Sequence, residues 1–415
     1  MAHGTLHIAP GTWHVALGTD NLTLQIYDPR ERALVSAGDA ALTALAALTW
    51  PFRRRRRPAA PARILLLRLE RIGDLLMTLP AIADVRAAAA GAEIDLAVGS
   101  WNADIAQAIR GVSGVLVVDA PWLARGGNGA NMQALARTTF GWRRRRYDLA
   151  INFEPDVRSN AMLALAGARW TAGYGSAGGG ALLDQALEYQ PADHTVDNAR
   201  RLVQAVLGAP ASGGGDARLA IPEAERREAS ARLAGRPGPL VAMHVAGGRA
   251  VKQWDPQRFA TVARDLVDQR DATIVLTGGP GDAPLVEAVK RALPAERVVD
   301  VSGLASLLLV AAVLERCDLM VTGDTGPMHL AAVVGTPIVA VFGPSDPRRY
   351  APCGPQDRVI RVDLPCAPCN RIRLPPARCT GHMPDCLALV TSDRVFEAAV
   401  SILDAGGERS VSAPA

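Results

Sequence analysis

The sequence predicts an α/β protein with two Rossmann-like domains, each a doubly wound parallel sheet, facing each other across a cleft. Three observations lead to this fold class. About half of the residues are hydrophobic but only 4% are aromatic, which is typical of helices packed on parallel strands. Short apolar runs alternate with helical stretches. The alternation stops once and restarts, and a chain of 415 residues is too long for one ordinary core.

The first run of alternation covers residues 63–207. It opens with "RILLLRL", which is typical of a strand buried on both faces, and continues through a corner into the helical stretch "GDLLMTLPAIADVRAAAAG". Further strands are predicted in "AEIDLAVGS", "VSGVLVVD" and "YDLAINFEP". Residues 208–222, "GAPASGGGDARLAIP", have the Gly-, Ser- and Pro-rich composition of an interdomain linker.

The second run covers residues 223–405, and we expect residues 406–415 to be a disordered tail. Its strands are predicted in "PLVAMHVAGG", "ATIVLTGG", "VVDVSG", "LMVTGD" and "PIVAVFGP". Because ligands of open parallel sheets bind at the carboxyl ends of the strands, we expect the loops of both domains to line the cleft between them.

Residues 1–62 form an extension unlike the rest of the chain. The segment "TWHVALGTDNLTLQIYD" could form one or two short strands, and "ALTALAALTWPFRRRRRPAAPA" combines a small-residue apolar face, two aromatics and five arginines. That pattern fits an amphipathic helix on an anionic membrane surface. A helix packed on the main body explains it equally well.

The charge balance argues against a nucleic-acid-binding protein, because the net charge is only +4. The positive charge gathers in Arg53–Arg57 and Arg143–Arg146. These runs could meet a phosphate-rich surface or an acidic substrate, or they could be solvated arginines. The N-terminus lacks a signal-peptide pattern, and the longest apolar stretch, Leu304–Leu314, is too short to cross a bilayer. We therefore expect a cytoplasmic protein.

Three corners of the second domain carry polar groups: "HVAGGRAVKQW", "TGGPGD" and "GDTGPMHL". The N-terminus of a helix binds phosphate readily, because its N–H groups lack intrahelical partners. Thr325 could donate through its hydroxyl, Gly326 would let the backbone approach an oxygen, and Lys252 would add a positive charge. The tripeptide Asp324–Gly326 taken alone could be a helix cap. Three such corners in one domain favour a diphosphate site.

In the first domain, Gly73 and Asp74 form a corner that would lie at the mouth of the cleft. An aspartate at a helix start is often only a cap. Because Asp74 would face the proposed diphosphate site, it is also a candidate general base.

Taken together, "RLERIGDLLMTLPAI", the K-x-W segment, "TGG" and "DTGPMHLAAVVGTPIVAVFGPSDP" resemble glycosyltransferase family 9, the lipopolysaccharide heptosyltransferase family with the GT-B fold. The resemblance extends from Arg63 to about Ala405. It implies an inverting transferase without a catalytic metal, with the nucleotide-sugar donor on the second domain and the acceptor on the first. The default donor is ADP-heptose, and the default acceptor is a lipid-linked or cell-surface glycan.

The resemblance also implies roles for individual residues. Asp74 resembles the general base that takes the proton of the acceptor hydroxyl. The donor would be bound by Lys252, Gly278, Gly279, Gly303, Leu304, Asp324, Thr325, Gly326 and His329. The sequence departs from well-known members before the GD pair, where Glu70, Arg71 and Ile72 replace the frequent Ser or Thr. This departure concerns the part of the first domain that would bind the acceptor.

Four cysteines, Cys366, Cys369, Cys379 and Cys386, have the spacing C-x2-C-x9-C-x6-C. In a reducing compartment this favours a structural zinc or iron site, and a few protein-glycosylating family members have an iron-binding finger in the same region. The alternative is a proline-rich loop of reduced cysteines. We expect no cofactor in the transfer reaction itself.

Other functions stay open at this stage. The same fold could use another nucleotide sugar, or a protein acceptor as the finger-bearing members do. A sugar-nucleotide 2-epimerase would share the GT-B architecture but would need other acid–base residues. A non-catalytic, membrane-associated scaffold would not need Asp74, Lys252 and His329 together.

Overall fold

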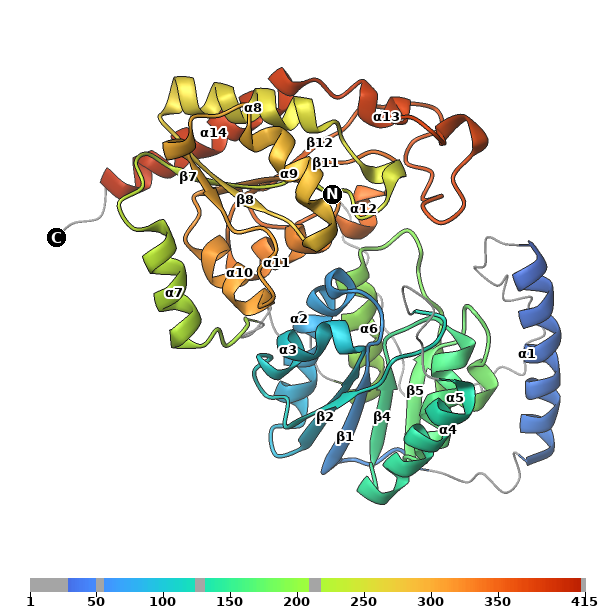
Figure 1. The fold of residues 1–415 in the computed structure, drawn as a ribbon. Coiled ribbons are helices and arrows are strands. Elements are labelled where there is room, and N and C mark those ends of the chain that lie inside the picture. The colour runs from blue at the N-terminus through green and yellow to red at the C-terminus, as the bar shows by residue number, and fades with distance from the viewer. Residues whose placement is uncertain (1–28, 50–55, 124–130, 209–217, 412–415) are drawn as a thin grey trace, which may run out of the picture.

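The computed structural model describes residues 29–49, 56–123, 131–208 and 218–411 (Figure 1). In these residues the chain forms two domains, each around a six-stranded sheet, and every strand pair in both sheets is parallel. The predicted fold class is therefore confirmed. The strands "TWHVALGTDNLTLQIYD" predicted near the N-terminus lie outside the described residues.

The sheet of the first domain has the order β3-β2-β1-β4-β5-β6. Its strands are β1 (Arg63–Leu67), β2 (Glu93–Val98), β3 (Gly114–Val117), β4 (Leu149–Asn152), β5 (Trp170–Tyr174) and β6 (Gln185–Leu187). Strand β1 lies in the centre, and Leu65 pairs with Asp95 on one side and Ala150 on the other. The loop that follows β1 therefore leaves from the middle of the sheet.

The second domain repeats this arrangement with the order β12-β11-β10-β7-β8-β9. Its strands are β7 (Leu240–His244), β8 (Thr273–Thr277), β9 (Val298–Asp300), β10 (Leu319–Gly323), β11 (Ile338–Val341) and β12 (Arg358–Ile360). Strands β7 and β10 are adjacent in the centre, with Thr322 paired to His244. Their carboxyl-end loops consequently lie side by side although they are distant in sequence.

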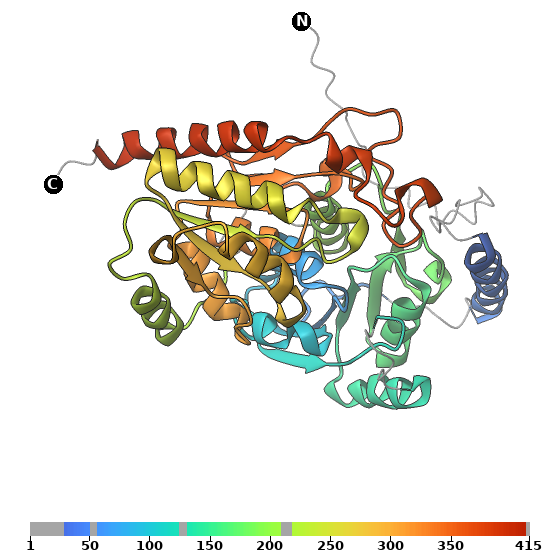
Figure 2. The same cartoon turned by 45° about the horizontal axis from the view of Figure 1, so that its top comes forward.

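Helices cover both sheets. Those of the first domain and its extension are α1 (Pro29–Thr49), α2 (Ile72–Ala88), α3 (Ala103–Gln107), α4 (Met132–Gly141), α5 (Val157–Ala166) and α6 (Thr195–Leu207). Those of the second domain are α7 (Glu223–Leu233), α8 (Pro256–Arg270), α9 (Ala283–Lys290), α10 (Leu307–Glu315), α11 (Gly326–Val334), α12 (Pro347–Tyr350), α13 (Asp385–Ala388) and α14 (Ser392–Val411). Helix α14 lies beside α8 on the outer face of its domain (Figure 2).

The two domains meet through helices α2 and α11 (Figure 1). Their buried side chains belong to one hydrophobic cluster, which includes Leu75 and Leu76 of α2 and Met328 and Ala331 of α11. The opposite faces of the two sheets have separate clusters. The apolar core is thus continuous across the domain junction, which fixes how the two carboxyl-end edges face each other.

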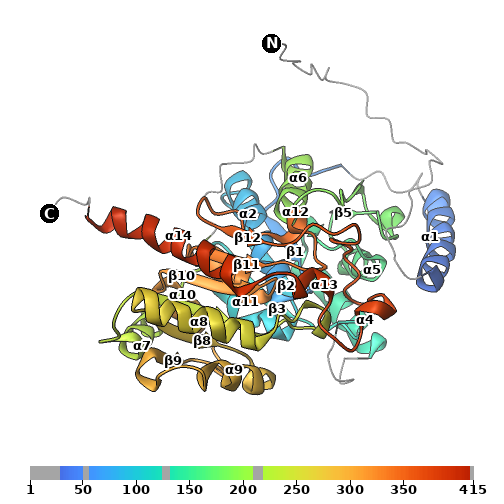
Figure 3. The same cartoon turned by 90° about the horizontal axis from the view of Figure 1, so that it is seen from above.

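The ends of the chain differ from the sequence-based expectations. Helix α14 runs to Val411, beyond residue 405 where the ordered chain was expected to end. The predicted helix of the extension begins earlier, at Pro29, and forms α1. It lies at the edge of the first domain, on the opposite side of the molecule from the end of α14 (Figure 3).

The described end of the predicted linker, residues 218–222, contacts the first domain. Leu219 forms a bridge with Ile109, and Ala220 donates a backbone hydrogen bond to Ala108. These contacts attach the second half of the linker to the first domain before α7 begins at Glu223.

Strands β5, β6 and β12 were not predicted, because they are short or lack a continuous apolar run.

Candidate active site

The loops after β7 and β10 bring Lys252 and Asp324 together. Lys252 ends a short 3-10 helix, and its Nζ lies 2.7 Å from Asp324 Oδ2. Asp324 is 9% exposed. Burial by itself raises the pKa of its carboxyl, but the charge of Lys252, the hydrogen bonds that the Lys252 and Ser345 side chains donate to the carboxylate, and the nearby His329 together outweigh burial. The net pKa lies below the ordinary value, so Asp324 is held ionised.

Helix α11 begins directly after this pair. Thr325 is its N-cap residue but makes no side-chain capping bond; its hydroxyl instead lies 3.2 Å from that of Thr322. The first N–H groups of α11 are therefore not occupied by a capping side chain, as an anion site at a helix start requires. His329 is buried in the first turn. Burial lowers the pKa of its imidazole, against the opposing effects of Asp324 and Asp74.

The two glycine-containing corners after β8 and β9 are also adjacent. Gly303 has a positive φ of 74° and donates its N–H to the carbonyl of Gly278 at 2.8 Å. The N–H of Gly279 is bound by Asp282 at 2.8 Å. Leu304 is half-buried against the core. These residues lie at the same edge as Lys252, although the Gly279 N–H already has a partner within the protein.

In the first domain, Asp74 occupies the third position of α2. Its Oδ2 accepts the backbone N–H of Arg71 at 3.3 Å, which is a capping contact. Its Oδ1 lies 3.4 Å from Nη2 of Arg68, a guanidinium that is only 3% exposed. Burial by itself lowers the pKa of the Arg68 guanidinium. The negative charges of Glu70, Asp74 and Glu154 together outweigh burial, so the net pKa of Arg68 is raised. Asp74 is therefore more than a cap.

Arg68, Glu70 and Glu154 form a cluster beneath Asp74. Arg68 Nη1 lies 3.4 Å from Glu70 Oε2 and donates to the carbonyl of Phe153 at 2.8 Å. Buried Glu154 accepts the backbone N–H groups of Leu69 and Glu70. Burial raises the pKa of both glutamates, and for each a neighbouring carboxylate adds to the effect. Sequence reasoning missed Arg68 and Glu154, although an arginine that ends an apolar strand was a usable signal.

The junction of α2 and α11 places the two halves of the site against each other. A methyl group added at Gly73 would come within 2.6 Å of the His329 ring, and one added at Gly326 would come within 2.4 Å of the Ile72 side chain. Both positions require glycine because the two helix starts touch there. Asp74 of the first domain thus lies close enough to His329 of the second to act on it by charge.

A cavity of about 780 Å³ opens beside Glu70 between the domains. Its lining includes Trp122 and Glu154 from the first domain, Val35 from α1, and Tyr350 and Arg373 from the second domain. It combines apolar and aromatic walls with charged groups, as ligand sites generally do.

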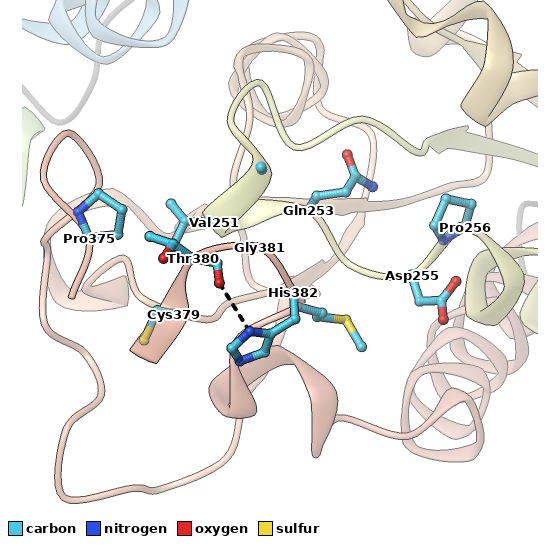
Figure 4. Close-up of a pocket in the computed structure, with 11 residues that line it drawn as sticks. Val251, Gln253, Asp255, Pro256, Pro375, Cys379, Thr380, Gly381 and His382 are labelled. Atoms are coloured by element: carbon cyan, nitrogen blue, oxygen red, sulfur yellow. Dashed lines mark hydrogen bonds between the residues drawn. The ribbon is translucent and has the colours of Figure 1, made fainter. Parts of the chain in front are cut away.

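The loop that carries the four cysteines (residues 366–386, the cysteine loop) packs against the segment that carries Lys252. Val251 and Gln253 line a pocket of about 570 Å³ together with Cys379, Thr380 and His382 (Figure 4). Burial raises the pKa of the Cys386 thiol to about 11, and the nearby Cys369, Cys379 and Cys366 add to the effect. Among the described residues, however, no three His, Cys, Asp or Glu side chains are arranged as metal ligands.

Comparisons with known proteins identify the family. Residues 137–375 match the model of glycosyltransferase family 9 (heptosyltransferase). Over 114 residues the chain is 32% identical to lipooligosaccharide heptosyltransferase 2 of Haemophilus influenzae, a match that covers 27% of this chain and 33% of the relative. Overall, the chain covers between about a third and about a half of the length of the first curated relatives that it matches.

Solved structures share the fold. The structure of E. coli ADP-heptose lps heptosyltransferase II superposes with a TM-score of 0.67 at 21% identity, over 83% of this chain and 99% of that one. The iron-containing dodecameric glycosyltransferase TibC of enterotoxigenic E. coli superposes with a TM-score of 0.51 at 14% identity, over 84% and 80%. The fold and the paired helix starts define a two-domain protein of the GT-B class. Because the family model matches more than half of the chain, the protein belongs to glycosyltransferase family 9.

Proposed function

We propose that this protein transfers a sugar from a nucleoside-diphosphate donor to a glycan acceptor, with inversion and without a catalytic metal ion. The default donor is ADP-heptose, and the default acceptor is a lipopolysaccharide-type glycan. Support comes from the family and from the names of its relatives, which are heptosyltransferases of lipooligosaccharide or lipopolysaccharide. The observation that carries the proposal is that Asp74 of α2 and the Lys252–Asp324 pair both lie close enough to His329, at the α2–α11 junction, to act on it by charge.

In the proposed mechanism, Asp74 accepts the proton of the acceptor hydroxyl as the hydroxyl oxygen attacks the anomeric carbon of the donor sugar. The bond between that carbon and the diphosphate oxygen breaks from the opposite face, and the nucleoside diphosphate leaves. Lys252 and the first N–H groups of α11 stabilise the negative charge that grows on the diphosphate. Asp324 holds Lys252 in place through its 2.7 Å ion pair. Gly278, Gly279, Gly303 and Leu304 would form the part of the donor site next to the nucleotide.

Thermal unfolding with ADP, UDP, GDP and CDP tests the donor site. A nucleotide at 100 times its dissociation constant adds about 2.7 kcal/mol to the free energy of unfolding. Stabilisation by ADP would support an ADP-sugar donor, and the release of ADP from ADP-heptose would then be measured with a deacylated lipopolysaccharide core oligosaccharide as acceptor. Stabilisation by another nucleotide would replace the heptose donor with a different nucleotide sugar. No shift with any of the four would contradict the proposed diphosphate site.

We also propose a structural iron or zinc ion at Cys366, Cys369, Cys379 and Cys386. The support is the set of four thiols, which suits these metals, and the fold shared with an iron-containing relative. The four thiols lie on one loop, and among the described residues they are not arranged as a ligand set in this structure. Elemental analysis of purified protein is expected to give about one iron or zinc per chain. If neither iron nor zinc is found, the metal proposal fails and the four cysteines are reduced thiols of a loop.

Finally, we propose that the protein works at the inner face of the cytoplasmic membrane. The support is the apolar helix α1 and the arginine run that follows it. Among the residues that the structure describes, no helix is long and apolar enough to cross a membrane. Arg57 is one arginine of the run with a structural role, because it donates to the carbonyl of Val206 near the end of α6 at 2.9 Å.

A further inference from the structure

The cavity of about 780 Å³ between the domains has one wall made by the cysteine loop. Arg371 and Arg373 of this loop line it together with Trp122 of the first domain. The loop extends from the second domain toward the first, on the side of α1 (Figure 2). Tyr350 also lines the cavity and lies close enough to Asp74 to be affected by its charge. The cavity therefore opens beside the proposed base.

The backbone holds the two arginines in place. Directly before them, the N–H groups of Cys369 and Asn370 both donate to the carbonyl of Pro344, at 3.1 and 2.8 Å. The side-chain oxygen of Asn370 accepts the N–H of Asp346, the N-cap residue of α12, at 2.8 Å. The segment that carries the arginines is therefore fixed to the start of α12, although their side chains are exposed.

The positive and negative groups of the cavity differ in how far the protein itself satisfies them. Four carboxyl groups line the cavity, and each has a hydrogen-bond or ion-pair partner within the protein: Asp39, Glu70, Glu154 and Asp156. Arg371 and Arg373, in contrast, form no hydrogen bond or ion pair with any residue that the structure describes. Arg373 acts by charge on Glu70, but burial raises the pKa of that carboxyl, so it opposes Arg373 less than an exposed carboxylate would. Two guanidinium groups are thus available to a ligand.

Aromatic rings are the second feature of this cavity. The guanidinium of Arg158 lies 4.8 Å from the centre of the Trp122 ring, and that of Arg349 lies 5.0 Å from the centre of the Tyr350 ring. All four side chains line the cavity. Such rings offer flat apolar surfaces to the C–H faces of sugars, and the polar groups around them can bind hydroxyls. None of the residues assigned above to the donor lines this cavity, so it suits the acceptor.

We propose that Arg371 and Arg373 bind a negatively charged group of the acceptor glycan, a carboxylate or a phosphate, so that the cysteine loop selects the acceptor. This inference rests on the proposed function, because it takes the cavity as the acceptor site. A guanidinium group binds either anion through paired, charge-assisted hydrogen bonds. The second domain would then discriminate between acceptors, although the base lies on the first. Two solvated arginines without a ligand would make no such distinction.

The test compares the wild type with the double variant Arg371→Gln and Arg373→Gln, with ADP-heptose as donor and the deacylated lipopolysaccharide core oligosaccharide as acceptor. The KM for the oligosaccharide should rise by about tenfold, because two charge-assisted contacts are lost, while the KM for the donor stays unchanged. Higher ionic strength should raise the wild-type KM for the oligosaccharide more than that of the variant. An unchanged KM for the oligosaccharide, or an equal rise in the KM for the donor, would overturn the proposal.

Modified acceptors identify the group that is bound. The comparison of KM is repeated with an oligosaccharide whose phosphates have been removed, with one whose carboxylates have been reduced to alcohols, and with one that lacks both. The modification that abolishes the difference between the wild type and the double variant marks the bound group. A difference that persisted in full with the acceptor lacking both groups would overturn the proposal.

The matched control is Arg378→Gln, compared with each of the two single variants. Arg378 is an exposed arginine of the same loop but does not line the cavity. Its substitution removes the same charge from the cysteine loop, so the KM for the oligosaccharide should stay at the wild-type value. A rise equal to that in Arg371→Gln and Arg373→Gln would mean that the loop attracts the acceptor only through its overall charge, and the assigned site would be wrong.

Binding measured without a donor separates this proposal from the proposed function. Calorimetry gives the dissociation constant of the oligosaccharide for the wild type and for the double variant, whose unfolding temperature should match that of the wild type. If the protein transfers no sugar but the variant binds the oligosaccharide about tenfold more weakly, the proposed function fails and the anion site stands. If transfer occurs and both proteins bind alike, this proposal alone fails. An oligosaccharide that does not bind the wild type would also overturn it.

Discussion

At the scale of residues, the site consists of charged groups whose neighbours fix their state. Asp324 is buried yet ionised because Lys252 lies against it, and Asp74 accepts a capping hydrogen bond while it contacts Arg68. The sequence could identify Asp74, Lys252 and Asp324, because their types and corners fit the proposed chemistry. It could not show which cation each carboxylate would contact. Lys252 lies on a different loop from Asp324, and Arg68 directly follows an apolar strand.

The first prediction concerns Asp74. Asp74→Asn keeps an oxygen that can accept the Arg71 N–H but cannot take a proton, so the transfer rate should fall by about 10²- to 10⁴-fold. Stabilisation by the nucleotide should be unchanged, since the donor is assigned to the other domain. Asp104→Asn, at the exposed start of α3, serves as the control for a helix-start aspartate outside the cleft. A normal rate in Asp74→Asn would rule out the base assignment.

The second prediction concerns the Lys252–Asp324 pair. Lys252→Ala should weaken nucleotide stabilisation and lower the unfolding temperature at pH 7, because it leaves Asp324 buried and charged without its cation. The lowered pKa of Asp324 means that the pair stabilises the fold above the ordinary carboxyl pKa and loses this contribution as the pH falls. The stability deficit of the variant should therefore be full from pH 7 to about pH 4 and shrink only as the pH falls below the ordinary carboxyl pKa of about 4.

Thermal scans across and below that pH range measure the deficit directly. The control is Lys290→Ala, which breaks a more exposed ion pair with Asp300 on the surface of the same domain. Surface pairs contribute about 0–1 kcal/mol, so this variant should remain close to the wild type. A Lys252→Ala deficit that stayed constant with pH would mean that Asp324 is not the group responsible.

At the scale of elements, the contact between α2 and α11 assembles the site. It depends on two glycines, because a side chain at either helix start would enter the other domain. The positions of Gly73 and Gly326 could be explained from sequence as ordinary corner glycines. Their closeness to His329 and Ile72 could not, because it arises from packing between elements about 250 residues apart.

This contact gives the third prediction. Gly326→Ala should destabilise the protein by about 1–3 kcal/mol, as overpacking does in a filled interior. Ile72→Ala removes the atom that the new methyl group would meet, so the double variant should lose less stability than the two single variants combined. Chemical unfolding measures all three. Gly141→Ala is the control, since nothing lies within 4 Å of an added methyl group there; equal losses in both glycine variants would contradict the packing account.

At the scale of the whole molecule, one apolar cluster crosses from the first domain to the second, whereas α1 lies at the edge. Helix α1 packs against the short 3-10 helix η4 (Gly180–Leu182), and Asp39 accepts the N–H of Gly179 at 2.5 Å. Its described side chains are mostly exposed. The two domains should therefore unfold in a way that depends little on α1.

The fourth prediction follows from this arrangement. A chain that starts at Arg56 keeps the Arg57 contact with α6 and should unfold within a few degrees of the full protein, with the same nucleotide stabilisation. It should pellet less with phosphatidylglycerol-containing vesicles, because α1 and three of the five arginines are gone. Equal pelleting of both chains would remove the support for membrane association, and loss of folding would show that α1 belongs to the core.

The sequence by itself determined the central strands of the two parallel sheets, because apolar runs buried on both faces leave a clear pattern in the chain. It also determined the corners that carry Asp74, Lys252 and Asp324, because strand ends and helix starts are local features. The tertiary structure alone decided that Arg68 serves both Glu70 and Asp74, that Glu154 supports their loop, and that His329 lies on Gly73. These contacts join groups whose closeness depends on strand order and on the packing of two domains, and neither is encoded in the spacing of residues along the chain.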